Sequence, residues 1–249
     1  MTGLFLAFLI VISVASFLQS KSSAATVYPS QIINLTNWKL TLPIGKNEKP
    51  IEIKQPDLAK FEIDPWFVAT LNGNGVRFRS PVNGMTTKGS NYPRSELREM
   101  TGSGVSNASW NSTSGVHSMF LDEAITALPS KKKHIVAGQI HDAKSDVIVI
   151  RLQDRSLFIN VDGENVKTLD SNYILGKRFS VKFVVKNGQT AVFYNGSSSP
   201  VYTLNKEYSG AYFKAGAYTQ SNCSKEESLK CTDTNYGEVI IFKLTVTHQ

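Results

Sequence analysis

The feature that most restricts the fold of this chain is a series of short alternating apolar and polar segments separated by turn residues. The clearest example is Asn187-Gly188, which joins segments 179–186 and 190–194, both rich in β-branched and aromatic residues. Asn-Gly at such a junction is typical of a two-residue β-hairpin, because both residues accept the positive φ of the tight turn. The sequence therefore predicts antiparallel strands joined by short turns.

The rest of the chain follows the same pattern and shows no sustained helical periodicity. One short helix is predicted at residues 57–61. Many short strands without alternating helices are typical of an all-β sandwich or jelly roll. No linker or repeat divides the 249 residues, so we expect one domain over residues 26–249. The other predicted strands are 147–152, 156–161 and 239–246, and the other predicted turns are Asp162-Gly163 and Asn195-Gly196.

An apolar run spans residues 4–18 and is followed by Lys21 and by small residues up to Ala25. This order is typical of a secretory signal peptide cleaved near Ala24 or Ala25, and we assign residues 1–25 to one. An uncleaved membrane anchor is the alternative, but the run is short for a bilayer span. We therefore expect a secreted, extracellular protein that has no membrane segment once the leader is removed.

Export agrees with the two cysteines, Cys223 and Cys231, which are close in sequence. In an oxidising compartment such a pair is expected to form a local disulfide. Five Asn-x-Ser/Thr sequons predict a glycoprotein if the source is a eukaryote and carry no meaning if it is a bacterium. The sequons begin at Asn34, Asn107, Asn111, Asn195 and Asn222.

The formal net charge of +7 attracts polyanions through the summed field of the protein. Nucleic acid and acidic polysaccharide are the two candidate partners. The sequence has no zinc-finger spacing, no RNA-binding aromatic signature and no long basic helix, so we expect no nucleic-acid partner. Its one basic run, residues 131–133, is typical of a solvated turn.

Three segments place polar side chains at every second residue, and a strand sends residues i and i+2 to the same face. The residues between them are mostly small or apolar and are expected to face the core. If the three segments are neighbours in one sheet, their polar residues form a face suited to a long anionic chain. These polar residues are Arg94, Glu96 and Arg98, then Gln139 and His141, then Tyr212, Lys214, Tyr218 and Gln220.

A polar outer face is also ordinary for an antiparallel sheet, and Glu96 between Arg94 and Arg98 could be a surface ion-pair ladder. The alternation by itself therefore leaves catalysis and plain solvation open. Glycoside hydrolysis needs two carboxylates at one site, whereas Glu96 and Glu99 are expected to face opposite ways. The four histidines show no metal-ligand spacing, so we expect no metal and no other cofactor.

The same three segments resemble motifs of the alginate lyases of polysaccharide lyase family 7. Residues 94–98, RSELR, are similar to the family's R-[ST]-E-L-R block, and residues 139–141, QIH, are similar to its Q-[IV]-H block. Residues 212–220, YFKAGAYTQ, are similar to its Y-F-K-A-G-x-Y-x-Q block. Residues 37–43 and 244–248 resemble the family's opening and its last strand, so the resemblance extends over the whole mature chain.

This resemblance implies a β-jelly roll of two antiparallel sheets with an open concave cleft, and a lyase that acts on alginate. Such lyases remove the C5 proton of a 1,4-linked uronate and expel the C4 oxygen, which leaves a 4,5-unsaturated oligosaccharide. The resemblance assigns carboxylate binding to Arg94 and Gln139, the base for guluronate to His141, and the acid to Tyr218. For mannuronate, Tyr218 would be base and acid. The residues expected to bind flanking substrate are Glu96, Arg98, Tyr212, Lys214 and Gln220.

Within the family, Ile at the position of Ile140 is associated with acceptance of guluronate-containing chains, and we expect endolytic action by a monomer. Two other functions stay open. One is a lyase on another polyuronate such as glucuronan, with the same residues and different flanking loops. The other is a non-catalytic polyuronate-binding module on the same fold, which would need neither Tyr218 nor His141.

Overall fold

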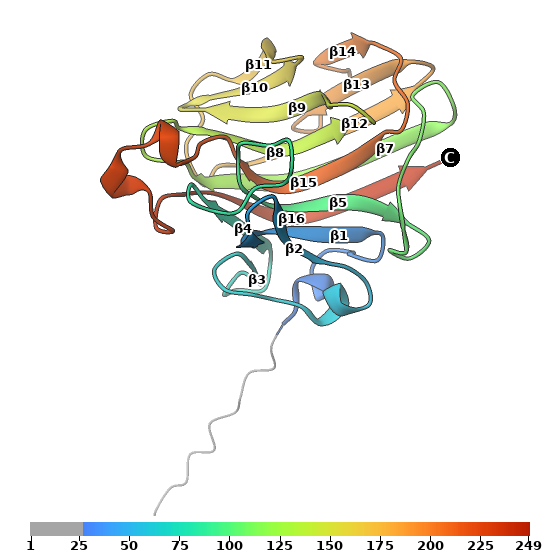
Figure 1. The fold of residues 1–249 in the computed structure, drawn as a ribbon. Coiled ribbons are helices and arrows are strands. Elements are labelled where there is room, and N and C mark those ends of the chain that lie inside the picture. Colours follow the sequence, from blue (N-terminus) through green and yellow to red (C-terminus); the bar gives the residue numbers. More distant parts are fainter. Residues whose placement is uncertain (1–26) are drawn as a thin grey trace, which may run out of the picture.

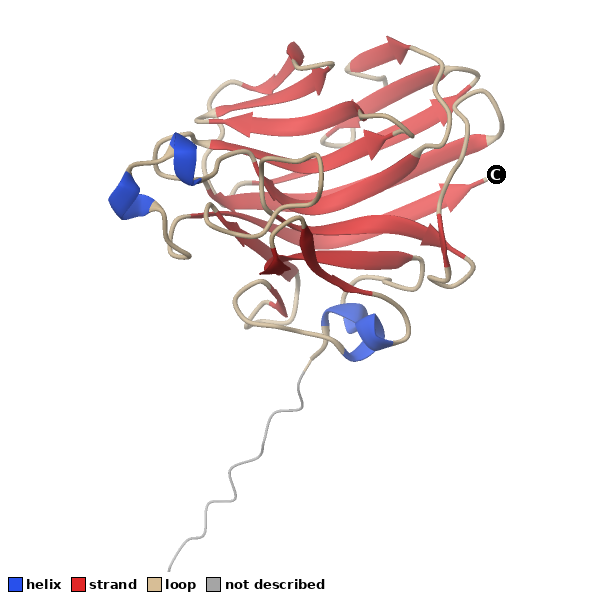
Figure 2. Cartoon of the chain, viewed as in Figure 1, coloured by secondary structure: helices blue, strands red, loops and turns tan. Residues whose placement is uncertain are grey.

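The computed structural model describes residues 27–249, so the predicted signal peptide at residues 1–25 lies outside the described residues. Two antiparallel sheets stack face to face as a β-sandwich (Figure 1). Within residues 27–249, helical structure is limited to short 3-10 turns at the periphery of the sandwich (Figure 2). These turns are η1 (Pro29–Gln31), η2 (Asp57–Lys60), η3 (Cys223–Lys225) and η4 (Ser228–Lys230). The helix predicted at residues 57–61 corresponds to η2.

Sheet 1 has nine strands in the order β11-β10-β9-β8-β15-β5-β1-β2, with β6 paired to β5. Strands that are distant in the chain are neighbours here, because β15 lies between β8 and β5. The strands are β1 (Trp38–Lys46), β2 (Lys49–Ile53), β5 (Arg94–Thr101), β6 (Ser106–Asn107), β8 (His134–His141), β9 (Asp146–Gln153), β10 (Ser156–Val161), β11 (Glu164–Asp170) and β15 (Tyr212–Thr219).

Sheet 2 has seven strands in the order β14-β13-β12-β7-β16-β4-β3. Its centre is the long pair β7 and β16, which cross the molecule behind sheet 1 (Figure 1). The strands are β3 (Phe67–Ala69), β4 (Val76–Pro81), β7 (Val116–Ala127), β12 (Arg178–Lys186), β13 (Gln189–Tyr194), β14 (Tyr202–Asn205) and β16 (Tyr236–His248).

The predicted hairpin between β12 and β13 is confirmed. Lys186 pairs with Gln189, and Asn187 and Gly188 both have positive φ, at 53° and 73°. Positive φ at both central residues is the geometry of a type I′ turn, whose twist matches that of the strands it joins. The turns at Asp162-Gly163 and Asn195-Gly196 are confirmed by the same sign of φ.

The core lies between the two sheets and is filled by every second residue of the paired strands. Sheet 1 contributes Leu97, Ile140 and Phe213, while sheet 2 contributes Leu121 and Phe183, all of them fully buried. Because the core takes one set of alternating residues, the other set on β5, β8 and β15 must face away from it.

The predicted disulfide between Cys223 and Cys231 is present, with their Cα atoms 4.9 Å apart. It closes the loop that carries η3 and η4. Among residues 27–249, no helix has both the length and the apolar composition needed to cross a membrane.

Candidate active site

The three polar segments singled out in the sequence are neighbours in sheet 1, in the order β8, β15, β5. Tyr218 on β15 is the register partner of Arg94 on β5, and Lys214 lies between Gln139 on β8 and Arg98 on β5. Register partners on adjacent strands have side chains about 5 Å apart on the same face. The strand order therefore brings the predicted residues together on the outer face of sheet 1.

Gly216 makes the close approach of β15 to β5 at the centre of this face. It pairs with Glu96 and has a φ of +134°. A Cβ atom at this position would lie 2.6 Å from the carbonyl oxygen of Ser95 and 3.0 Å from the Cα atom of Glu96. Any larger residue would push the two strands apart, so glycine is needed here to hold Arg94 beside Tyr218.

Glu96 is the residue that three other site residues contact. Only 1% of the residue is exposed, yet its carboxylate accepts three charged or polar contacts. Lys214 Nζ lies 2.5 Å and Arg94 Nη1 3.1 Å from its Oε2 atom, and Gln139 Nε2 donates to its Oε1 atom at 2.5 Å. The predicted alternative of a solvent-exposed ion-pair ladder is therefore wrong for this residue.

The ionisation of this cluster follows from its burial and its charges. Burial alone would raise the pKa of Glu96, but Lys214 and Arg94 lower it more, so the net pKa is below its usual range. Burial lowers the pKa of Lys214 to about 8, helped by Arg94 and opposed by Glu96. At neutral pH Glu96 is thus a carboxylate and Lys214 an ammonium. The carboxylate of Glu96 orients the guanidinium of Arg94 and the amide of Gln139.

The Tyr218 phenol lies between a guanidinium and a hydroxyl. The Arg94 guanidinium carbon is 3.8 Å from the centre of the Tyr218 ring, a cation–π contact. The Tyr218 hydroxyl and Ser90 Oγ are 2.9 Å apart, and Arg94 Nη2 donates to the same Ser90 oxygen at 3.1 Å. Ser90 comes from the loop before β5 and was not predicted, because nothing in the sequence distinguishes it from other loop serines.

The tautomer of His141 is determined by the backbone beside it. His141 Nδ1 lies 2.7 Å from the carbonyl oxygen of Asp142, which can only accept, so Nδ1 carries the proton and Nε2 keeps its lone pair. Burial lowers the pKa of His141, with Lys214 acting in the same direction and Asp142 against it. The imidazole is therefore neutral at neutral pH and competent as a base.

On the side of this face that carries His141, aromatic and cationic groups are stacked on one another. The His141 and Tyr212 rings are stacked with centres 5.1 Å apart, and the Arg98 guanidinium carbon lies 3.8 Å from the centre of the Tyr212 ring. On the other side of Tyr218, Gln220 lines a hollow of about 210 Å³ together with Gln139 and Tyr218. All nine predicted site residues thus lie on one face. Glu96 and Gln139 are the least accessible of them, with 1% and 2% of the residue exposed.

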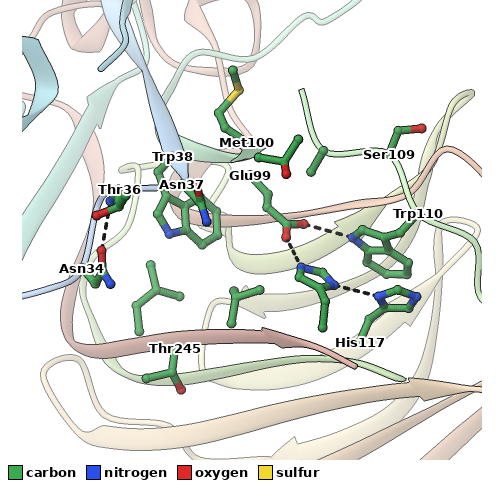
Figure 3. A pocket seen from close by; sticks show the side chains of 15 residues that line it. Asn34, Thr36, Asn37, Trp38, Glu99, Met100, Ser109, Trp110, His117 and Thr245 are labelled. Atoms are coloured by element: carbon green, nitrogen blue, oxygen red, sulfur yellow. Dashed lines mark hydrogen bonds and ion pairs between the residues drawn. The ribbon is translucent and has the colours of Figure 1, made fainter. Parts of the chain in front are cut away.

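A second hollow of about 440 Å³ lies at the edge of the sandwich, between the two sheets (Figure 3). As predicted, Glu99 faces the opposite way from Glu96, and it ends in this hollow. Its oxygens contact Trp110 Nε1 at 3.0 Å and His248 Nε2 at 2.5 Å, and His248 Nδ1 lies 2.7 Å from His117 Nδ1. Each polar side-chain atom in this series of four linked residues has a hydrogen-bond partner within the protein. This indicates a structural role.

Within residues 27–249, no group of three or more His, Cys, Asp or Glu side chains is arranged as a metal site. The outer face of sheet 1 thus carries a guanidinium, an amide, a neutral imidazole and a phenol.

Comparison with known proteins identifies the family of this chain. The alginate lyase family profile matches residues 33–248. The chain is 50% identical to an alginate lyase from Corynebacterium sp., over 90% of this chain and 99% of that one, with a TM-score of 0.86. It is 49% identical to the polysaccharide lyase family 7 alginate lyase AlgAT5, over 90% and 100% of the two chains, with a TM-score of 0.84.

More distant relatives extend the comparison. The chain is 26% identical to a variant of the family 7 alginate lyase A1-II′ that was solved with the substrate GGMG, over 89% of this chain and 97% of that one, with a TM-score of 0.74. A curated alginate lyase of Klebsiella pneumoniae is 34% identical over 82 residues, which span 32% of this chain and 27% of that protein. Both the sandwich and the matched profile identify a β-jelly roll, and the chain belongs to the alginate lyase family.

Proposed function

We propose that this protein depolymerises alginate by β-elimination at 1,4-linked uronates. The observation that carries the proposal is the strand order β8-β15-β5, in which Arg94 pairs with Tyr218 and Gln139 pairs with Lys214, so that Arg94, Gln139, His141 and Tyr218 share the outer face of sheet 1. Family membership supports the substrate, and the net charge of +7 supports an anionic polymer.

Carboxylate binding is the first requirement of the reaction. The C5 hydrogen is weakly acidic because the adjacent carboxylate is already negative, and its removal places more charge on that carboxylate. Arg94 and Gln139 are donors that would bind the developing dianion more strongly than the ground state, which lowers the barrier. Glu96 takes no part in the chemistry. It orients both donors, so it is a positioning residue rather than a substrate ligand.

The proton transfers follow from the tautomer and from the phenol. His141 Nε2 accepts the C5 proton, the C5–H electrons form the C4=C5 double bond, and the C4–O4 bond breaks. Tyr218 donates its proton to O4, and exchange with solvent restores both residues. When mannuronate reacts, the C5 proton is on the other side of the ring, and Tyr218 acts as base and acid.

Endolytic action on guluronate-containing chains is part of the proposal. Arg98 and Tyr212 lie on one side of the reacting position and Gln220 lies on the other, so sugars can be bound on both sides. The lone pair on His141 Nε2 supports anti elimination, which guluronate requires. An endolytic enzyme will lower the viscosity of alginate well before reducing ends accumulate.

The test is an assay on alginate, its separated homopolymeric blocks and glucuronan, following the ultraviolet absorbance of the unsaturated uronate. Turnover of alginate with none of glucuronan supports the proposal, and the reverse pattern would assign the enzyme to another polyuronate. We expect Tyr218→Phe to lose at least about 100-fold in kcat, because it removes the general acid, and to bind oligosaccharides as before. A wild-type protein that binds every substrate and turns over none would be a non-catalytic binding module.

We also propose that the protein is exported as a monomer with its leader removed. The disulfide supports an oxidising compartment, and the sequons at Asn34, Asn107 and Asn222 are all at exposed or partly exposed positions. Mass spectrometry of protein from the culture medium will show whether the chain begins near residue 26 and whether it carries glycans. Light scattering of the same material measures the oligomeric state.

A further inference from the structure

The hollow beside Tyr218 continues the site toward β9. It is bounded by the loop 89–92, by β8 and by β9, and it has a volume of about 210 Å³. Two of the proposed catalytic residues, Gln139 and Tyr218, form one of its walls, while Val136 and Val149 provide apolar surface. A polymer bound at the reacting position therefore has space for a further sugar here.

A single row of register partners connects this hollow to the reacting position. Arg94 pairs with Tyr218, Tyr218 with Val136, and Val136 with Arg151. Adjacent strands are about 4.8 Å apart, so the row spans four strands with an arginine at each end and the phenol between them. Arg151 thus stands on the far side of the proposed acid from the guanidinium that holds the reacting carboxylate.

Two of the donors that line the hollow lack acceptors. The Arg151 side chain forms no hydrogen bond or ion pair to any other described residue, and its Nε atom is buried. Gln220 is 8% exposed, and its Nε2 atom is likewise buried without an acceptor in residues 27–249. Leaving buried donors unpaired destabilises the protein, and more so for a charged group, so they favour a ligand rich in oxygen acceptors.

The charges around Arg151 select an anionic ligand. A guanidinium stays charged, even though burial lowers the pKa of Arg151 while Asp146 raises it. Asp146 also lines the hollow, but it is not within ion-pair distance of Arg151. Lys132, whose Nζ donates to the Tyr92 hydroxyl at 2.6 Å, adds a second cation behind the hollow wall. The planar guanidinium matches the two oxygens of a carboxylate.

We infer that this hollow is a carboxylate subsite in which Arg151 and Gln220 bind the uronate next to the one that undergoes elimination. The inference rests on the proposed lyase function for the identity of the polymer. It adds to that function a specificity residue on β9, outside the three motifs. Because Tyr218 separates the two arginines, the bound uronate is on the side of the oxygen that Tyr218 protonates.

The experiment compares Arg151→Gln with Arg155→Gln. Arg155 is exposed on the turn after β9 and does not line the hollow, so the control removes the same charge from the same region. We expect Arg151→Gln to lower kcat/KM on alginate by roughly 10- to 100-fold, as for a lost charged hydrogen bond, mostly through KM. Arg155→Gln should stay within about threefold of the wild type, and Arg151→Lys should recover part of the loss.

Binding is measured separately, by calorimetric titration of alginate oligosaccharides of increasing length in the Tyr218→Phe background. The Arg151→Gln penalty should appear only once the oligosaccharide is long enough to reach the hollow. Equal affinities and equal kinetics for the two Gln variants, with unchanged melting temperatures, would overturn the subsite and leave the lyase intact. A wild-type protein that forms no unsaturated product, but whose binding depends on Arg151, would overturn the lyase and keep the subsite.

Discussion

Individual residues of the site are held in place by charges buried together. Glu96 compensates two cations, Lys214 and Arg94, in a region from which water is nearly excluded. Removing one member of a buried cluster leaves uncompensated charge, which costs more than the pair itself contributes. The same cluster therefore determines both the orientation of the donors and the local stability.

The first prediction concerns this cluster. We expect Glu96→Leu to lower the free energy of unfolding by about 3–5 kcal/mol, because Lys214 and Arg94 are left buried without their counter-charge. Adding Lys214→Met to Glu96→Leu should recover part of that loss. Urea denaturation at pH 7 measures both variants. Losses that simply add in the double variant would show that the carboxylate and the ammonium are not coupled.

Glu123 is a second buried carboxyl, and it belongs to the core rather than the site. It lies on β7, is fully buried, and neither of its oxygens has a hydrogen-bond partner in residues 27–249. Burial, with a smaller effect of Asp122, raises the pKa of Glu123 to about 8. In the folded protein this carboxyl is therefore protonated at neutral pH.

The second prediction follows from that shift. Between pH 5 and pH 8 the unfolded chain has Glu123 ionised while the folded protein keeps it protonated, so stability falls as pH rises. This group contributes a slope of about −1.4 kcal/mol per pH unit, which ends above the folded pKa. Glu123→Gln should remove that contribution, whereas Glu164→Gln, the same change at an exposed position, should not. Denaturation curves at several pH values measure the slopes, and identical slopes in both variants would contradict the assignment.

At the scale of strands, the two sheets are joined by a hydrogen-bonded chain as well as by the core. Glu99 on β5 belongs to sheet 1, while His248 on β16 and His117 on β7 belong to sheet 2. His117 Nε2 lies 2.7 Å from the carbonyl oxygen of Ser114, which completes the chain at a loop. These contacts join the two sheets at an edge of the sandwich, away from the outer face of sheet 1.

The third prediction tests this connection. His248→Ala should lower the free energy of unfolding by about 1–3 kcal/mol, because the buried Glu99 Oε1 atom loses a hydrogen-bond partner. His248→Gln keeps a donor and should lose less. The kcat on alginate should change little in either variant, since Glu99 faces away from Tyr218 and His141. A large fall in kcat without a fall in stability would assign the histidine chain to the reaction.

At the scale of the whole molecule, the net charge of the protein acts on the polymer over longer distances than any single contact does. The chain carries +7, and its substrate would be a polyanion. A basic hollow lined by Lys131, Lys132, Lys133 and Lys225 lies beyond the proposed subsite, at the start of β8. The run at residues 131–133 thus lines this hollow, and Glu226 accepts hydrogen bonds from the backbone N–H groups of Lys131 and Lys132.

The fourth prediction is a dependence on ionic strength. Raising salt from about 0.01 M to 0.15 M shortens the screening length from about 30 Å to about 8 Å. We expect KM for polymeric alginate to rise with salt and kcat to stay nearly constant. A short oligosaccharide, which reaches fewer of these cations, should show a smaller change in KM. An equal salt effect on kcat and KM would indicate that the long-range field is not what attracts the polymer.

The sequence by itself determined the local structure and the candidate residues. Alternation assigns Arg94, Gln139, His141 and Tyr218 to outward faces of strands, and the Asn-Gly and Asp-Gly turns delimit the hairpins, because both depend on residues close in the chain. It also determined the disulfide, since Cys223 and Cys231 are near neighbours in sequence.

Only the tertiary structure decided which strands are neighbours and how deep each side chain lies. The alternation along the strand predicts the side of the sheet to which Glu96 points. It predicts neither the burial of Glu96 nor its three partners, which come from β5, β8 and β15. The same limit applies to Arg151, although a charged residue that interrupts the apolar run 147–152 was a signal that could have marked it. Depth and neighbours are set by pairing between strands that are distant in the chain, as where β15 pairs with both β5 and β8, and local periodicity carries no information about that pairing.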